Sequence, residues 1–254
     1  MSYTVLIPAR MGSQRLPGKP LADIHGKPMI QRVFEQTRLS NASRTVVATD
    51  DQAIFDSVIG FGGEVVMTGS HHISGTDRLA EACDILQIPA DTTIVNVQGD
   101  EPLIPPVCID QVAKDLQQSS CDMATLCQPL TEQAHWHEPN VVKVVRNQRQ
   151  EALYFSRASI PFERSAPARR GEVAALAECY RHVGIYAYSA GFLREFVSWG
   201  ACHLEQTEKL EQLRALYHGA RIMACVADVL IPPGIDTADD LCKVRQILAK
   251  KDSK

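Results

Sequence analysis

The sequence lacks the long hydrophobic runs from which membrane helices are made. No apolar stretch approaches the roughly 20 residues that a spanning helix needs, and the N-terminus shows no charged segment followed by an apolar one before a cleavage site. Eight cysteines are present, but no two of them form a C-x-x-C pair, which argues against zinc ribbons and thioredoxin-type sites. We therefore expect a cytoplasmic protein without membrane insertion, in which most cysteines are reduced and structural.

An excess of basic charge is also missing. The chain has 26 Lys and Arg against 30 Asp and Glu, a formal net charge of −4. Proteins that bind nucleic acid non-specifically normally present a basic surface, so no nucleic-acid partner is expected. With 254 residues, 45% of them hydrophobic, the chain is long enough to bury a sizeable core.

Two closely spaced histidines beside a tryptophan could ligate a metal. His135 and His137 flank Trp136, but no further cysteine or histidine clusters nearby to complete a site. A metal pair at these histidines therefore remains only an alternative.

One basic loop stands out against this background. It follows a short apolar run, residues 3–7, and combines three cations with small residues: Arg10, Gly12, Ser13, Arg15, Gly18 and Lys19. Glycines bring backbone N–H groups close to an anion, arginines grip phosphate oxygens in pairs, and a lysine acts as a mobile point charge. The pattern is neither G-x-x-x-x-G-K-[ST] nor G-x-G-x-x-G. We interpret the loop as a triphosphate-binding element; a solvated basic turn is the alternative.

The hydrophobic periodicity predicts an α/β fold. Residues 44–49, 64–68, 92–97 and 123–126 read as strands, and helical patterns at 28–39, 53–59, 79–86 and 102–118 alternate with them. This rhythm predicts a mostly parallel central sheet with helices on both faces, a Rossmann-like core. After residue 129, strands at 141–145, 151–155, 183–188 and 221–227 and helices at 191–199, 204–217 and 238–249 indicate a mixed, partly antiparallel region. Residues 164–177 are expected to form a mobile surface loop.

A carboxylate lies just beyond a predicted strand of the kind that is buried on both faces. Asp100 follows residues 92–97, with Gly99 before it and Glu101 after it. Ligands of open α/β sheets collect at the carboxyl ends of strands, and carboxylate oxygens suit Mg²⁺. We interpret Asp100 as a metal ligand, with a helix cap as the alternative.

Six longer strings follow one another in an order typical of one family. They are Ser74–Arg78 (SGTDR), Val95–Pro102 (VNVQGDEP), Leu153–Pro161 (LYFSRASIP), Arg181–Tyr186 (RHVGIY), Glu208–Arg214 (EKLEQLR) and Gly234–Thr237 (GIDT). Together with the basic loop they resemble the sugar nucleotidyltransferases with a Rossmann-like core. Within that superfamily the chain is similar to the cytidylyltransferases that activate acidic sugars, and most similar to the branch that uses 3-deoxy-manno-octulosonate (Kdo).

This resemblance implies an activity and its partners. A member would transfer CMP from CTP to Kdo for lipopolysaccharide biosynthesis, use Mg²⁺ and form a homodimer. The whole chain, 1–254, would be a single domain, with residues 1–128 mainly binding the nucleotide and residues 129–254 mainly serving the sugar and dimerisation.

The resemblance also implies roles for individual residues. It adds Ser74 and Arg78 to the loop residues Arg10, Gly12, Ser13, Arg15 and Lys19 as the nucleotide site. The sugar acid would contact Gln98, Arg157, His182, Tyr186, Glu211 and Gln212. Asp236 would share the metal with Asp100, and the catalytic set would be Arg10, Arg15, Lys19, Asp100 and Asp236.

Structural roles remain open alternatives for several of these residues. The segment around Ser74 could be a plain loop before a helix capped by Thr76 or Asp77, and Asp236 could belong to the capping turn before Thr237. Arg157 could be a surface arginine and His182 a structural histidine, while Glu211 and Gln212 could lie on a solvated helix face. Two rival functions also stay open: a cytidylyltransferase for another sugar acid, such as 8-amino-Kdo or sialic acid, and a non-catalytic nucleotide-binding module.

Overall fold

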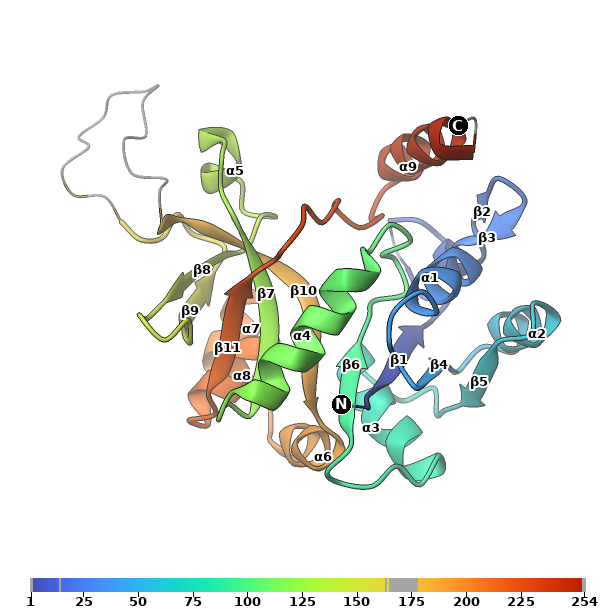
Figure 1. The fold of residues 1–254 in the computed structure, drawn as a ribbon, viewed down its shortest axis with the longest axis horizontal. Coiled ribbons are helices and arrows are strands. Elements are labelled where there is room, and N and C mark those ends of the chain that lie inside the picture. Colours follow the sequence, from blue (N-terminus) through green and yellow to red (C-terminus); the bar gives the residue numbers. More distant parts are fainter. Residues whose placement is uncertain (1, 14, 163, 165–177, 253–254) are drawn as a thin grey trace.

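The computed structural model describes residues 2–13, 15–162, 164 and 178–252 (Figure 1). These residues form one large sheet with the strand order β11-β7-β10-β6-β1-β4-β5, extended by the hairpin β8-β9 beside β10. Four strands from the first half of the chain pair in parallel: β1 (Thr4–Ala9), β4 (Arg44–Thr49), β5 (Glu64–Met67) and β6 (Thr93–Asn96). The predicted parallel core is confirmed.

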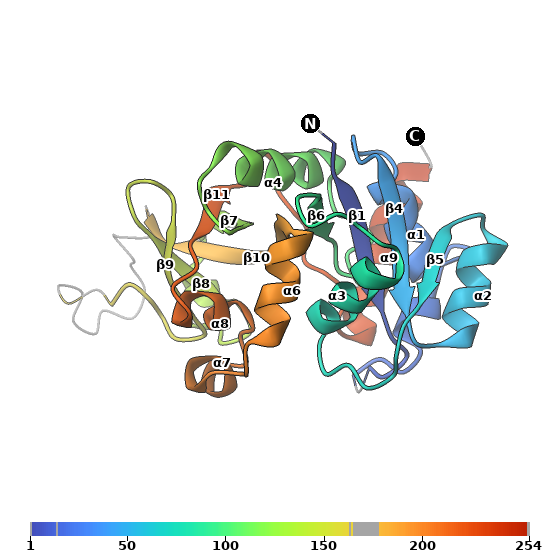
Figure 2. The ribbon, with the colours of Figure 1, turned by 90° about the horizontal axis from the view of Figure 1, so that it is seen from below.

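Helices cover both faces of this sheet (Figure 2). One hydrophobic core packs α1 (Met29–Thr37), α2 (Gln52–Gly60) and α4 (Pro106–Gln118) against one face. The other core packs α3 (Gly75–Ile85) and α6 (Ala190–Ser198) against the opposite face. Within β1, Val5 and Ile7 belong to the first core and Leu6 to the second, because successive side chains of a strand point to opposite faces. The continuous apolar strands therefore reflect burial on both sides.

The second half of the chain makes the sheet mixed. Strand β10 (Tyr180–Ser189) is antiparallel to β6 on one side and to β7 (Met123–Pro129) on the other, and β11 (Ile222–Val226) runs parallel to β7. The hairpin of β8 (Lys143–Arg146) and β9 (Ala152–Ser156) pairs with the start of β10. A short helix, α5 (Gln133–His137), precedes this hairpin.

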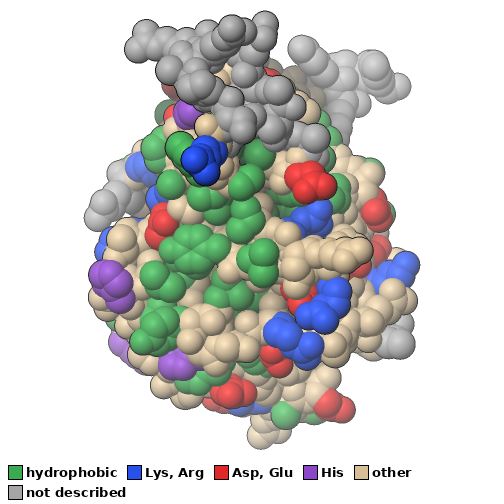
Figure 3. All heavy atoms as spheres, turned by 90° about the vertical axis from the view of Figure 1, so that its left-hand side faces the viewer, with side chains coloured by type: hydrophobic (Ala, Val, Ile, Leu, Met, Phe, Trp, Pro, Cys, Tyr) green, Lys and Arg blue, Asp and Glu red, His purple; other side chains and the backbone are tan. Residues whose placement is uncertain are grey.

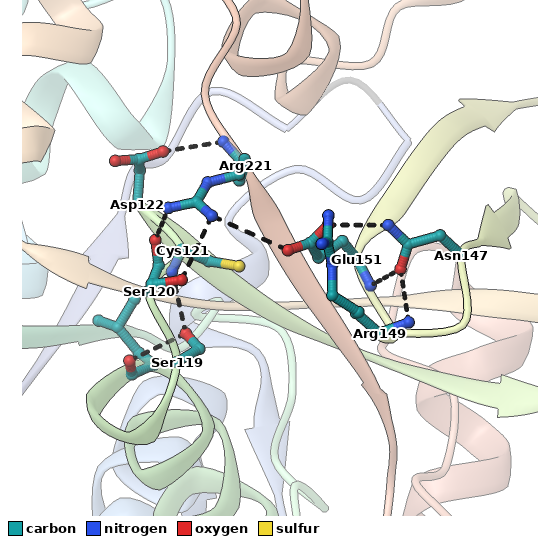
Figure 4. Close-up of polar contacts among 9 residues, drawn as sticks. Ser119, Ser120, Cys121, Asp122, Asn147, Arg149, Glu151 and Arg221 are labelled. Atoms are coloured by element: carbon teal, nitrogen blue, oxygen red, sulfur yellow. Dashed lines mark hydrogen bonds and ion pairs between the residues drawn. The ribbon is translucent and has the colours of Figure 1, made fainter.

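Polar contacts fasten the hairpin to the rest of the sheet (Figure 4). At the start of β11, the Arg221 backbone N–H donates to Asp122 Oδ2 at 2.8 Å, and its guanidinium lies 4.0 Å from Glu151. Asn147 in the hairpin turn donates to the same Glu151 carboxylate at 2.8 Å. These contacts fix the distance between β9 and β11.

Three sequence expectations differ from the structure. The helix expected over 204–217 is two helices, α7 (His203–Glu208) and α8 (Gln212–Tyr217), because Lys209 adopts a left-handed conformation (φ 54°) that ends α7. Helix α3 is capped by Ser74 rather than by Thr76 or Asp77: Ser74 and Asp77 exchange side-chain and backbone hydrogen bonds in a capping box. Helix α4 begins four residues later than residue 102, at Pro106 after Pro105.

The basic loop does not lead directly into α1. It ends in a short 3-10 helix, η1 (Lys19–Leu21), and the small hairpin of β2 (Asp23–Ile24) and β3 (Lys27–Pro28) comes before α1. The last helix, α9 (Ala238–Asp252), packs here, with Ile235, Leu241 and Val244 in one cluster with Ile24 and Met29. Helix α9 is thereby held beside the basic loop.

Two further observations concern bulk expectations. In the part of the chain that the structure describes, no helix is both long and apolar enough to cross a lipid bilayer. All eight cysteines are described, and none is in a disulfide. The surface loop expected at 164–177 lies, except for residue 164, outside the described residues.

Candidate active site

A cavity of about 670 Å³ opens at the carboxyl edge of the parallel strands. It lies where β1 and β6 end, which is where open α/β sheets bind their ligands. Its lining includes all the predicted nucleotide residues except Ser74, together with Gln98 and both predicted metal ligands: Arg10, Gly12, Ser13, Arg15, Lys19, Arg78, Gln98, Asp100 and Asp236. The structure thus brings together residues that are as many as 226 positions apart in the chain, from Arg10 to Asp236.

Lys19 links the two aspartates. Its Nζ atom lies 2.6 Å from Asp100 Oδ2 and 3.2 Å from Asp236 Oδ1, and the lysine side chain is only 11% exposed. Arg15 reaches the same Asp236 oxygen at 3.1 Å from the solvent side. Two cations of the loop and two carboxylates from distant segments are therefore in mutual contact on the cavity wall.

The segment before α9 brings Asp236 to this point. The backbone N–H of Ile235 donates to the Asp100 carbonyl at 2.9 Å. Gly234 makes the approach possible, since a Cβ atom there would lie 3.2 Å from that carbonyl oxygen and 3.0 Å from Glu101 Oε1. Helix α9 is attached to strand β2, because the Arg245 guanidinium donates to the Asp23 carbonyl at 2.6 and 3.0 Å. Thr237 and Asp240 form the expected cap of this helix.

Two other glycines in the site have definite steric roles. Gly18, just before η1, has φ 68°, a value that side chains other than glycine rarely tolerate. A Cβ at Gly99 would lie 2.8 Å from the Pro8 carbonyl, so only glycine permits the close approach of the two strand ends. Gly12, by contrast, has open space around its Cα position and lines the cavity without such a constraint.

Arg78 is held rigidly by two neighbouring strand ends. Its guanidinium donates to Asp50 Oδ2 at 2.8 Å and to Thr68 Oγ1 at 2.6 Å, and the residue is 2% exposed. Asp50 follows β4 and Thr68 follows β5, so Arg78 also ties these strands to α3. Asp50 was missed as part of the site, although its place directly after a predicted strand was a usable signal.

A second residue that the sequence interpretation left unassigned is Glu101. Burial, and then the negative charges of Asp100 and Asp236, raise the pKa of its carboxyl group to about 8, although Arg181 acts in the opposite direction. Two carboxylates, Asp100 and Asp236, contact the Lys19 ammonium, and a neutral Glu101 next to Asp100 limits the accumulated negative charge.

A second, small cavity of about 20 Å³ lies beside the first. Three predicted sugar-binding residues line it together with Thr76, Tyr188 and apolar side chains: Thr76, Met123, Tyr186, Tyr188, Phe192, Phe196, Glu211 and Gln212. Glu211 Oε1 and Gln212 Nε2 are shielded from solvent and have no hydrogen-bond partner among the described residues. Shielded polar atoms without partners are costly in a protein alone, which indicates a place for the polar groups of a ligand.

Two predicted sugar residues lie outside the linings of both cavities. The His182 ring contacts Phe155 and Tyr186 and bonds to Thr125 Oγ1 at 3.0 Å. Burial is the main cause that lowers the pKa of His182 to about 3, and the positive charge of Arg181 is the smaller cause. The imidazole is therefore neutral. The Arg157 guanidinium donates to the carbonyls of Glu208 (2.7 Å) and Pro139 (2.9 Å). Arg157 lines neither cavity, and its role in carboxylate binding stays a prediction.

The acidic pair fits a divalent metal that also takes oxygen atoms from a substrate. Mg²⁺ keeps several waters and commonly binds through one or two carboxylates plus phosphates. Asp100 and Asp236 supply two, and their contact with one lysine shows that a cation is stabilised between them. Among the described residues no three His, Cys, Asp or Glu side chains gather as a closed metal site, and this includes the surroundings of His135 and His137.

An open α/β sheet with a cationic loop and paired carboxylates at the carboxyl edge of its strands defines a nucleotide-binding protein of the nucleotidyltransferase class. Comparisons with known proteins make the assignment specific. The model of the cytidylyltransferase family matches residues 4–222. The 3-deoxy-manno-octulosonate cytidylyltransferase of Pseudomonas fluorescens is 55% identical over 97% of this chain and 98% of its own, and that of Vibrio vulnificus is 53% identical over 99% and 100%.

Solved structures agree with these relatives. CMP:2-keto-3-deoxy-manno-octonic acid synthetase, in complex with CTP, superposes with a TM-score of 0.89 at 41% identity over 98% of this chain and 99% of that one. A 4-diphosphocytidyl-2C-methyl-D-erythritol synthase, 13% identical, shares the fold with a TM-score of 0.64. The chain belongs to the cytidylyltransferase family and, within it, to the 3-deoxy-manno-octulosonate cytidylyltransferases.

Proposed function

We propose that the protein transfers CMP from CTP to Kdo, with release of pyrophosphate. The anomeric hydroxyl of the sugar acid attacks the α-phosphorus in line, so one P–O bond forms as the bond to the pyrophosphate oxygen breaks. The observation that carries the proposal is the meeting of Lys19, Asp100 and Asp236 on the wall of the large cavity. Phosphoryl and nucleotidyl transfers depend mainly on positioning and on neutralising charge, which this arrangement suits.

The basic loop would bind the triphosphate. Arg10, Arg15 and Lys19 line one side of the large cavity, with Gly12 and Ser13 between them. The volume of about 670 Å³ lies within the range of small-molecule sites. Lys19 contacts two carboxylates, and the phosphates of CTP would compete with them for its ammonium group. Arg78, held by Asp50, would present a fixed positive charge at the same cavity.

Mg²⁺ is the proposed cofactor, with Asp100 and Asp236 as its protein ligands. When bound, it supplies a Lewis acid that neutralises phosphate oxygens and acidifies a coordinated hydroxyl. The chain itself contributes the two carboxylates, the loop cations and a cavity wall in which Gly99 places no side chain.

The sugar acid would lie between the two cavities. Gln98 lines the large cavity, while Tyr186, Glu211 and Gln212 line the small one. Gln98 donates to Asn96, which is the ladder partner of Tyr186, so the two linings are connected through neighbouring strands. Residues 1–128 would thus serve mainly the nucleotide, and residues 129–254 the sugar, within a single domain.

A homodimer is proposed through the face that carries β8 and β9. Figure 3 shows hydrophobic side chains gathered on this face. Leu153 on the edge strand β9 is 60% exposed, and the nearby α8 carries Tyr217, 61% exposed. Exposed apolar patches of this kind commonly mark protein interfaces. We place the enzyme in the cytoplasm, in keeping with eight cysteines outside disulfides.

A pyrophosphate-release assay tests the function. The protein should release pyrophosphate when it is given CTP and Kdo. It should release much less when UTP replaces CTP, or when 8-amino-Kdo or sialic acid replaces Kdo. Asp100→Asn and Asp236→Asn should each reduce turnover by at least a hundredfold, about 2.7 kcal/mol of transition-state stabilisation, with an unchanged circular dichroism spectrum. Turnover with sialic acid but not with Kdo would support the rival branch, and no turnover with any sugar acid would support a non-catalytic module.

A further inference from the structure

The first turn of α3 lies between the two cavities and contacts both. Gly75 and Arg78 line the large cavity, whereas Thr76 lines the small one. Ser74 anchors the turn as the N-cap, and the capping box with Asp77 fixes its backbone. The position of Thr76 relative to the large cavity is therefore fixed, and its side chain faces the proposed sugar residues.

Thr76 makes one short hydrogen bond across the small cavity. Its hydroxyl donates to Glu211 Oε2 at 2.5 Å, joining two residues that are 135 positions apart. The residue is 8% exposed, so water does not compete freely for this bond. The other oxygen of the same carboxylate, Oε1, has no hydrogen-bond partner among the described residues, although the Arg214 guanidinium lies 3.9 Å from it.

The Glu211 carboxylate also has a charged neighbour. Arg214, one turn along α8, has its guanidinium 3.9 Å from Glu211 Oε1 and bonds firmly to Glu205 at 2.6 and 2.8 Å. Without the Thr76 hydroxyl, rotation of the Glu211 side chain toward Arg214 would be favoured by charge. The Thr76 bond, together with the nearby Ser74 side chain, thus favours the orientation in which Glu211 lines the small cavity.

We propose that Thr76 is a positioning residue that holds Glu211 ready to accept a hydrogen bond from a hydroxyl of the sugar acid. The proposal rests on the proposed function and adds to it a residue outside the predicted sugar set. It also connects the two substrates, because the same helical turn carries the nucleotide-facing Gly75 and Arg78. The ligand chemistry is that of a polyhydroxylated sugar, since Glu211 Oε1 offers an acceptor and Gln212 Nε2 offers a donor.

The test compares Thr76→Val, which keeps the shape and removes the hydroxyl, with Thr76→Ser, which keeps the hydroxyl. The valine variant should raise KM for Kdo by about tenfold or more and leave KM for CTP within about twofold, while serine restores most of the loss. Thr93→Val is the matched control, because Thr93 is buried to a similar extent (9%), lines neither cavity and bonds to Gln117. It should leave both KM values unchanged.

A double-mutant cycle with Glu211→Ala separates positioning from packing. If Thr76 acts through Glu211, adding Thr76→Val to Glu211→Ala should change KM for Kdo less than twofold. The inference is overturned if the valine variant leaves KM for Kdo unchanged, raises both KM values equally, or is not rescued by serine. Failure of the parent to use CTP and Kdo would instead refute the proposed function, and CTP binding measured by calorimetry distinguishes the two cases. Should the valine variant not fold, Thr76→Ala takes its place in the same comparison.

Discussion

Replacing Lys19 by methionine should leave two carboxylates facing each other without the cation between them. In the parent, Nζ lies 2.6 Å from Asp100 and 3.2 Å from Asp236. Methionine keeps most of the apolar stem of lysine, so the substitution removes charge with little change of volume. Arg15 still reaches Asp236, but its side chain is 63% exposed, where an ion pair contributes little.

Coulomb's law gives the size of the effect. Oxygens that share one ammonium at these distances lie at most about 6 Å apart, where two unit charges repel by about 3 kcal/mol at an effective dielectric constant of about 20, and by about 0.7 kcal/mol in bulk water. The Asp100 and Asp236 side chains are 32% and 51% exposed, so the repulsion falls between these limits. A loss of about 1 to 3 kcal/mol corresponds to a melting temperature lower by roughly 3 to 10 °C in a chain of this size.

Thermal melting of the nucleotide-free protein, in EDTA and in Mg²⁺, measures this directly. Lys19→Met should melt below the parent in EDTA, and Mg²⁺ should raise its melting temperature more than that of the parent, because the metal takes the place of the ammonium. Turnover of CTP should fall at the same time, since a cation that neutralises phosphate is lost.

The double variant Lys19→Met with Asp236→Asn serves as the control. It removes the repulsion, so it should recover much of the melting temperature in EDTA and lose the extra response to Mg²⁺. The reasoning is refuted if Lys19→Met melts with the parent in EDTA and both respond equally to Mg²⁺. In that case the two carboxylates do not form one cation site.

Three further predictions follow from other parts of the structure. If the Arg157 guanidinium binds the sugar carboxylate instead of its backbone carbonyls, Arg157→Ala should raise KM for Kdo more than KM for CTP in steady-state kinetics. Equal effects on both KM values would mean that Arg157 instead stabilises the end of α7. His182 has a pKa of about 3, below its value in the unfolded chain, so the unfolded state binds the extra proton between pH 6.5 and 3. Stability should therefore fall on acidification by up to about 1.4 kcal/mol per pH unit, and His182→Phe should reduce this slope in urea unfolding, whereas an unchanged slope would contradict the assignment. Leu153→Glu together with Tyr217→Glu should convert the proposed dimer to a monomer in size-exclusion chromatography with light scattering, and a parent that is already monomeric would rule the dimer out.

Much of the fold was determined by local sequence pattern. The run Arg44–Thr49 became strand β4 at the predicted residues, and residues 28–39 contain α1, because β-branched runs and three-to-four spacing of apolar residues favour strand and helix before any long-range contact forms. The break between α7 and α8 could not be read in this way. Its cause is the single left-handed residue Lys209, at a position where lysine carries no local turn signal.

Some residues of the site could also be identified from the local sequence, and others could not. Residue types and their places after strands identified Arg15, Lys19 and Asp100 as charged groups at a ligand-binding edge. The resemblance to a known family then added Asp236.

Only the tertiary structure decided how these groups meet. The docking of α9 on the β2-β3 hairpin brings Asp236 to the ammonium group of Lys19, and the capping turn of α3 brings Thr76 to Glu211. Such pairings depend on which faces bury together, and burial is a property of the whole packed chain that no local window of sequence contains.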